Sequence, residues 1–202
     1  MLKIWGRVNA PNVQKVLWAC EELGLSYERV DLGGPFGGGD DPAYLAKNPN
    51  GLIPTLEDGD FVLWESHAIL RYLAGKAKSE ALYPGELRRR GVVDQWLDWQ
   101  AVHQAHAVRA LVKLLVAPGA GPADPAQVEA ARRAAEPLFT VLNSRLLRSA
   151  HVAGDGFSLA DIPNAIGARR WMSLPIERPV LTALQDWLGQ LSERPAFRRL
   201  AG

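Results

Sequence analysis

The stretch Asn48–Ala74, NPNGLIPTLEDGDFVLWESHAILRYLA, decides the fold. Its residue types predict a strand over 53–57, a return strand over 61–64 and a helix that begins at Ser66. The Asp58-Gly59 pair between the strands is a strong hairpin signal, and the apolar residues after Ser66 recur at helical spacing. The stretch therefore predicts a strand–turn–strand–helix unit.

The two ends of this unit carry groups suited to a ligand. Pro54 has no N–H and fits only the start of a strand, and a cis bond before it would aim the Ile53 backbone outward. Glu65-Ser66 stands at a helix N-terminus, where free N–H groups and the helix dipole favour a carboxylate. Glu65 can accept from an ammonium, so a peptide with an amino-acid head would suit this unit. The alternative for Ser66 alone is a helix cap.

This ordered set of motifs resembles the glutathione-contacting half of the cytosolic glutathione transferases. The matching parts are N-P-x-G-x-I-P-x-L, the D-G hairpin and the helix start E-S-x-A-I-L-x-Y-L. Within that superfamily, the chain resembles bacterial, theta-like or nu-like members. The resemblance implies a thioredoxin-like, glutathione-binding domain with the order βαβαββα, followed by an all-helical bundle. It also implies glutathione as cosubstrate and a homodimer.

Patterns in the rest of the chain agree with this architecture. Residues 2–5 predict a strand, residues 13–23 have helical spacing closed by Gly24, and 27–32 alternate as a second strand, which makes one βαβ unit. The glycine-rich segment GGPFGGGDD is not a phosphate loop, because no Gly-Lys-Ser/Thr follows it. Residues 42–47 could form one or two helical turns.

Strand signals vanish after a polar linker, which supports a domain at 1–78, a linker at 79–87 and a helical domain at 88–202. Helices are expected over 88–115, 127–148 and 180–191, with the loop APGAGPADPA between the first two. Pro137 could kink or break the second of these helices. The sequence Ser158–Asp161 has the form of a capping box before a further helix.

Composition limits the partners. The 23 Lys and Arg residues nearly balance the 22 Asp and Glu residues, which argues against nucleic acid or an anionic membrane. No apolar run approaches the roughly 20 residues of a membrane span, and the start of the chain lacks a signal-peptide pattern. A single cysteine allows no internal disulfide and no cysteine-rich zinc site. We therefore expect a cytoplasmic protein without a metal.

Glutathione chemistry needs a group that favours the thiolate. A cysteine thiol has a pKa of about 8.5, and lowering it by roughly two units takes about 2.7 kcal/mol. A hydrogen bond to a charged acceptor supplies about 1.5–3 kcal/mol, so one donor near the first helix nearly suffices. Family members use Tyr, Ser or Cys there, and this chain has none of them in GRVNAPNVQKVLW. The resemblance places Asn9 at the family's serine position, and its amide can donate without deprotonating.

Other candidate residues have two interpretations each. Asn12 is expected to cap the first helix and is the second candidate donor, while Asn9 could be a plain turn residue. Gly51 and Leu52 replace the His or Lys that relatives often use for the glycine carboxylate, which leaves Lys47, Asn50 or backbone N–H groups. His67 either assists at the binding site or is a surface helix residue. Cys20 is expected to be buried and inert.

The segment VVDQWLDWQAVHQAHAVRALVKLL resembles the helix that lines the electrophile pocket in theta-like members. The resemblance assigns four residues at similar spacing to this pocket: Gln100, His103, His106 and Arg109. Trp171 could close the pocket, although core packing is its alternative, and a polar bundle face is the alternative for the others. His103 and His106 have no acidic or cysteine companion at zinc-ligand spacing.

Two functions are compatible with these residues. The first is a detoxification enzyme that conjugates glutathione to a small hydrophobic electrophile or uses it to reduce peroxides or disulfides. The second is a non-catalytic glutathione-binding or protein-interaction module with the same fold. The missing Ser, Tyr or Cys favours the second hypothesis, whereas the retained pairs Ile53-Pro54 and Glu65-Ser66 favour the first.

Overall fold

The computed structural model describes residues 1–116 and 123–201, and its contacts divide the chain into two compact units. The first unit is Met1–Pro84 together with the segment from Arg194 onward, and the second is Gly85–Glu193. No helix in the described part of the chain combines the length and the apolar character that a membrane crossing requires.

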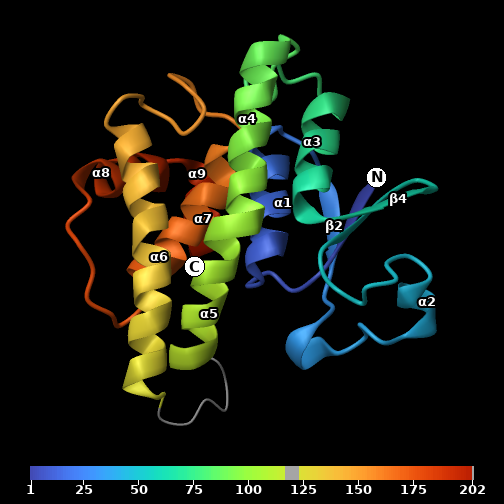
Figure 1. Ribbon diagram of the computed structural model, residues 1–202. Coiled ribbons are helices and arrows are strands. Elements are labelled where there is room, and N and C mark those ends of the chain that lie inside the picture. The colour runs from blue at the N-terminus through green and yellow to red at the C-terminus, as the bar shows by residue number, and fades with distance from the viewer. Residues whose placement is uncertain (117–122, 202) are drawn as a thin grey trace. The chain divides into compact units, whose positions relative to one another are not determined.

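The first unit is built on a four-stranded mixed sheet with the order β2-β1-β3-β4 (Figure 1). β1 runs parallel to β2, and β3 is antiparallel to both β1 and β4. Asp58 pairs with Phe61, so the hairpin turn is Gly59-Asp60, one residue later than the sequence signal. The strands are β1 Leu2–Trp5, β2 Tyr27–Val30, β3 Thr55–Asp58 and β4 Phe61–Trp64.

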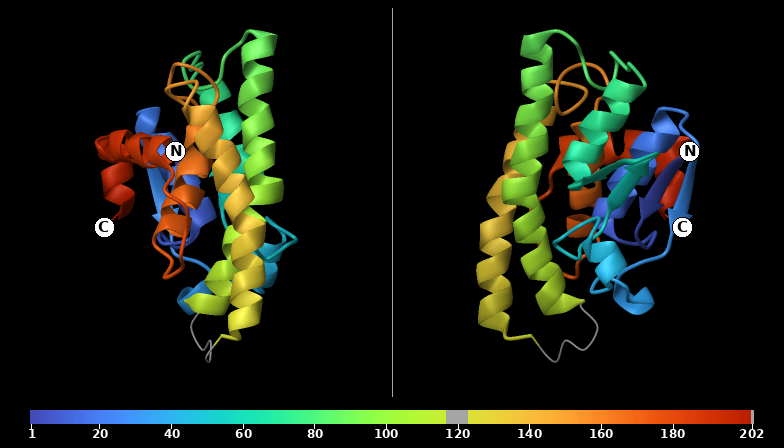
Figure 2. Two further views of the ribbon diagram at one scale, coloured as in Figure 1. Left: turned by 60° about the vertical axis from the view of Figure 1, so that its left-hand side comes forward. Right: turned by 90° about the vertical axis from the view of Figure 1, so that its right-hand side faces the viewer.

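The helices of this unit follow the predicted βαβαββα order, which confirms the thioredoxin-like half of the fold. α1 and α3 lie side by side (Figures 1 and 2), and their apolar faces join β1 and β3 in one buried core around Ile4, Val16 and Ile69. The helices are α1 Pro11–Glu22, a 3-10 turn at Gly34–Phe36, α2 Pro42–Leu45 and α3 Ser66–Lys76.

A last helix, α9 (Pro195–Ala201), completes the first unit and was not predicted. Arg194 forms an ion pair with Glu22 of α1 at 2.6 Å, and the ring of Phe197 packs on Trp18 with centroids 4.8 Å apart. Burial alone would raise the pKa of Glu22, but hydrogen bonds from Arg194 and Trp18 outweigh it and hold the pKa below its usual value. These contacts, distant in sequence, hold a helix too short to be recognised from its own pattern.

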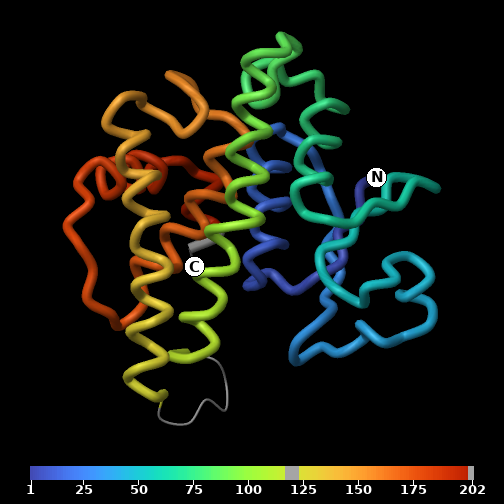
Figure 3. The backbone as a smooth tube through the Cα atoms, viewed as in Figure 1, coloured from blue at the N-terminus to red at the C-terminus, as the bar shows by residue number. Residues whose placement is uncertain are grey.

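The second unit is all-helical, as predicted. One long helix is continuous in Figure 3 and consists of α4, a π-helical turn and α5, where the sequence predicted one α-helix over 88–115. Pro137 does not break α6, and six residues of the predicted loop 117–126 lie outside the described ranges. The elements are α4 Leu87–Trp99, the π turn Gln100–Gln104, α5 Ala105–Leu115, α6 Pro125–Leu146, α7 Asp161–Met172 and α8 Thr182–Ser192.

The predicted capping-box residues Ser158 and Asp161 form a buried hydrogen-bond network at the start of α7, but the N-cap is Ala160 and makes no side-chain cap hydrogen bond. The Asp161 carboxylate is fully buried and accepts hydrogen bonds from the backbone N–H groups of Ser158 and Val152 at 2.8 and 3.0 Å. It also accepts from the Ser158 hydroxyl and from the Trp187 indole. The segment before α7 and the helix α8 are thereby tied to one side chain, which makes Asp161 a central support of the second unit.

Candidate glutathione site

Three segments of the first unit meet at one edge of the sheet. Trp5 pairs with Thr55, and Thr55 pairs with Trp64, so the ends of β1 and β4 flank the start of β3. The loop after β1 leads through Asn9 into α1, while Glu65-Ser66 leads from β4 into α3. Ile53-Pro54 lies between them. The residues that the sequence singled out in the first unit are therefore gathered at this edge by strand pairing.

The Ile53–Pro54 bond is cis, and a buried polar network holds the chain on both sides of it. Tyr44 and Asn48 both donate to the Leu52 carbonyl, at 2.6 and 2.8 Å, and both contact the Thr55 hydroxyl. Neither Tyr44 nor Asn48 was assigned a role from the sequence. The Ile53 backbone N–H and C=O make no hydrogen bond within the described residues, so both remain available to a ligand.

Close backbone packing explains why this edge is rich in glycine. A Cβ on Gly6 would lie 2.5 Å from Val13 and 3.1 Å from the Ile53 Cβ, so the β1–α1 loop packs directly on Ile53. A Cβ on Gly51 would lie 2.6 Å from the Gly39 carbonyl oxygen. The glycine-rich segment 33–41 therefore packs through Gly39 against the backbone just before Ile53.

Glu65 and Ser66 form an open helix start. Glu65 is the N-cap of α3 with φ 71°, in a region that non-glycine residues adopt only with strain, and its side chain makes no cap hydrogen bond. Ser66 is the first residue of α3, which corrects the alternative that it caps the helix. The side chains of Glu65 and Ser66 have no hydrogen-bond partner among the described residues. A strained acid beside an unused hydroxyl is typical of a ligand site.

His67 is buried, with 8% of its surface exposed, so the alternative of a surface helix residue is wrong. Its Nε2 lies 3.1 Å from the Nζ of Lys15, a buried residue of α1. An ammonium can only donate, so His67 Nε2 is the acceptor in this pair. The pair links the two helices that begin at this edge, and Lys15 was not foreseen because nothing local in the sequence marks its partner.

Asn9 lies exposed in a turn closed by the hydrogen bond from Ala10 N–H to the Arg7 carbonyl. Its Oδ1 accepts a hydrogen bond from Arg7 Nη1 at 2.5 Å, which leaves its Nδ2 as the outward donor. Nδ2 has no partner in the described part of the chain. The amide nitrogen of Asn9 is therefore available to donate to a ligand.

Asn12 does not cap α1, contrary to the sequence prediction. The N-cap is Ala10, Pro11 is the first helical residue, and no side chain caps the helix. Proline is favoured at this first position because its missing N–H would be unused anyway. The backbone N–H groups of Asn12 and Val13 thus remain open beside Asn9.

The two candidates for a carboxylate contact before Ile53 differ. Lys47 is committed to Glu57, with its Nζ 2.7 Å from the carboxylate. Burial would raise the pKa of Glu57, but the hydrogen bonds from Lys47 and Trp5 hold that pKa below its usual value. Asn50 is exposed and donates through Nδ2 to Asn48 Oδ1 at 3.0 Å. Asn50 is therefore the more accessible of the two.

Cys20 is fully buried in the core of the first unit. Burial, together with the nearby Glu21 carboxylate, raises the pKa of its thiol to about 12. Its expected role as an inert core residue is confirmed.

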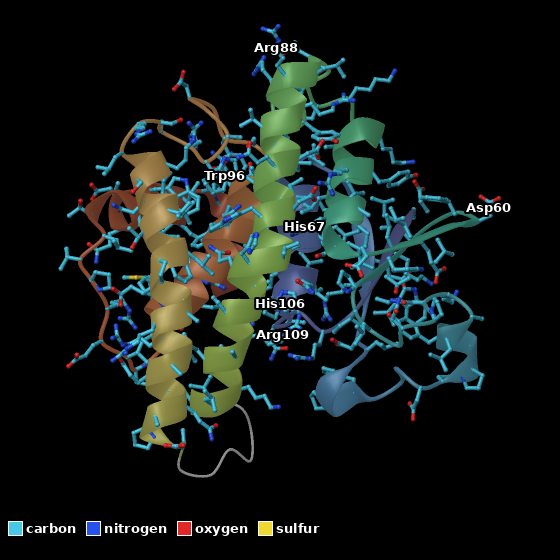
Figure 4. All side chains as sticks on the ribbon, in the orientation of Figure 1. Asp60, His67, Arg88, Trp96, His106 and Arg109 are labelled. Atoms are coloured by element: carbon cyan, nitrogen blue, oxygen red, sulfur yellow. The ribbon has the colours of Figure 1, made fainter. Side chains whose placement is uncertain are left out.

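In the second unit, the residues assigned to an electrophile pocket separate into two environments. His103, His106 and Arg109 are exposed, and Figure 4 shows His106 and Arg109 on the same side of α5. Gln100 is buried at the start of the π turn. Trp171 needs a correction, because it is fully buried in the core and stacks on Phe139 with centroids 4.1 Å apart.

Comparisons with known proteins agree with this geometry. Residues 1–75 match the family described as glutathione S-transferase, N-terminal domain. Glutathione S-transferase GstB of Escherichia coli (strain K12) is 37% identical over 202 residues, which cover 99% of this chain and 97% of that protein. Glutathione S-transferase 4 of Zea mays is 35% identical, with 99% and 92% covered.

Solved structures show the same similarity over nearly the full length. The theta class glutathione S-transferase from the citrus canker pathogen Xanthomonas axonopodis pv. citri, solved with glutathione bound, has a TM-score of 0.91 and 42% identity. The match covers 98% of this chain and 95% of that one. Glutathione transferase F7 from Populus trichocarpa has a TM-score of 0.87 at 28% identity, with 100% and 98% covered. With relatives of this identity matched end to end, the chain belongs to the glutathione S-transferase family and is a glutathione transferase.

Proposed function

We propose that the sheet edge of the first unit binds glutathione in an extended form. Glu65 accepts from the γ-glutamyl ammonium, and Ser66 with the open start of α3 receives the γ-glutamyl carboxylate. The Ile53 backbone pairs with the cysteinyl peptide group, Asn50 contacts the glycine carboxylate, and Lys15 through His67 supports the α3 start. The observation that carries the proposal is the strained Glu65 beside the unused Ser66 hydroxyl.

The chemistry that follows from this placement needs only a stabilised thiolate. Asn9 Nδ2 donates to the sulfur, with Asn12 as the alternative donor, and the thiol proton leaves to solvent. With an aryl halide, the thiolate sulfur forms the new S–C bond and the halide departs with the electron pair of the broken bond. The proposed reaction uses no metal. Reduction of peroxides or disulfides is the second candidate, because the same thiolate initiates it.

The second substrate is a small hydrophobic electrophile in this proposal. Gln100, His103, His106 and Arg109 are the candidate contacts on the second unit, supported by the resemblance and by the exposure of the last three. We also propose a cytoplasmic homodimer. Light scattering at micromolar concentration tests the assembly, and a monomer would contradict it.

Glutathione binding measured by calorimetry tests the site. Glu65→Ala should weaken binding by about 1.5–3 kcal/mol, the value of a hydrogen bond to a charged group. Asp60→Ala is the matched control, because Asp60 is an exposed acid at the hairpin turn (Figure 4) with no partner among the described residues. Equal affinity of the two variants would overturn the assignment. Parallel assays with an aryl halide and a peroxide then separate conjugation from reduction, and inactivity in both favours a binding module.

A further inference from the structure

Arg7 lies in the loop between β1 and α1 and has no role in the glutathione contacts proposed above. Its guanidinium forms no ion pair with a carboxylate in the part of the chain that the structure describes. Its one side-chain hydrogen bond there is the 2.5 Å contact from Nη1 to Asn9 Oδ1. The Arg7 guanidinium is thus hydrogen-bonded to a neutral amide rather than paired with a carboxylate.

The surroundings of Arg7 keep its guanidinium in place. Its Nε is buried and has no partner within the described residues. A Cβ on Gly34 would lie 2.7 Å from this Nε and 3.1 Å from Cδ, so the 3-10 turn packs closely against the side chain. Gly34 has φ +59°, a conformation that glycine adopts without strain. The glycine therefore gives the arginine room to reach Asn9.

An asparagine amide can present either its oxygen or its nitrogen, and only the nitrogen can donate to a thiolate. The guanidinium has donors and no acceptor, so its contact with Asn9 selects the oxygen. The nitrogen then faces away from Arg7 as a fixed donor. We propose that Arg7 is a positioning residue that sets the orientation of Asn9 for the glutathione thiol; this inference rests on the proposed role of Asn9.

Thiolate absorbance against pH, with glutathione bound, tests the inference in four proteins: the parent, Arg7→Met, Asn9→Ala and the double variant. Arg7→Met removes the donors and should raise the thiol pKa by about one unit, a tenfold smaller ionisation constant. The shift should disappear in the Asn9→Ala background, because no amide remains to be oriented. Glutathione affinity at a pH where the thiol is protonated should stay unchanged.

Two glycine variants provide an independent test without changing Arg7. Gly34→Ala should displace the guanidinium, because the added Cβ would clash with it. Gly37→Ala is the matched control, since Gly37 has φ +61° in the same loop and nothing lies within 4 Å of an added Cβ. Both variants should lose similar thermal stability, but only Gly34→Ala should raise the thiol pKa.

The outcomes separate this inference from the proposed function. An unchanged titration in Arg7→Met, with a shifted one in Asn9→Ala, overturns the inference and leaves the thiolate donor standing. Equal shifts from Arg7→Met in both backgrounds also overturn it, because Arg7 would then act by charge alone. If Asn9→Ala leaves the titration of the parent unchanged, the donor assignment fails and the inference fails with it.

Discussion

The helices α1 and α3 begin without a side-chain cap, whereas α4 and α6 begin with one. Glu86 accepts from two backbone N–H groups at the start of α4, and Asp124 accepts from one at the start of α6. The N-cap residues of α7 and α8 make no side-chain cap hydrogen bond, although Asn143 accepts from the first turn of α8. Among the described helices without a side-chain cap, α1 and α3 begin at the sheet edge. An N–H that no side chain satisfies is available to a ligand.

The largest expected effect is at the buried Asp161, the first residue of α7. Asp161→Ala should lower the free energy of unfolding by about 3 kcal/mol or more, because buried donors on three residues lose their acceptor and each costs about 1–3 kcal/mol. Chemical denaturation gives this value. Glutathione affinity of the folded protein should not change, since Asp161 lies in the second unit and the proposed site in the first. A loss below about 1 kcal/mol would mean that the buried hydrogen bonds of Asp161 contribute little.

Ser66→Ala should give the opposite result at α3. Glutathione should bind about 1.5–3 kcal/mol more weakly, as for a lost hydrogen bond to a carboxylate, while the free energy of unfolding without ligand changes by less than about 0.5 kcal/mol. Calorimetry and denaturation measure the two effects on one sample. A large loss of stability with unchanged affinity would show that Ser66 caps the helix after all.

The smallest expected effects are the changes in stability from substituting Asp124 and Asn12. Asp124→Ala should cost about 1 kcal/mol of stability, the usual value of a lost cap. Asn12→Ala should change stability by less than about 0.5 kcal/mol, because Asn12 is the second residue of α1 and caps nothing. Melting curves of the two variants make the comparison. Equal losses would remove the distinction between the capped and uncapped starts.

Much of the first unit could be predicted from local signals. The Asp-Gly turn, Pro54 and the helical spacing after Ser66 act over a few residues, and the hairpin and α3 follow from them. The hairpin turn lies one residue later than predicted, because the pairing of Asp58 with Phe61, rather than the Asp-Gly signal, sets the register. Once these strands pair, the candidate site residues at their ends come together at one edge of the sheet.

The roles of single side chains were harder to predict. Ser66 and Asn12 were expected as caps because of their residue types, but the cap position depends on where the backbone turns into the helix. Pro11 was the available signal for α1, since proline favours the first helical position. Arg7 and Lys15 were missed because their orientation depends on Gly34 and His67, which belong to other segments. Trp171 was assigned to the pocket wrongly because a tryptophan on a helix has the same sequence spacing whether it lines a pocket or packs in the core.

The position of α9 has a consequence for how the chain folds. Arg194 and Glu22 are 172 residues apart in sequence, yet both belong to the first unit. During synthesis the sheet and α1 emerge first, but Arg194, which pairs with Glu22, and α9, whose Phe197 packs on Trp18, follow only after the whole second unit. Domains generally fold as they leave the ribosome, and closing so long a loop costs entropy. The first unit to begin folding is therefore the last to be completed.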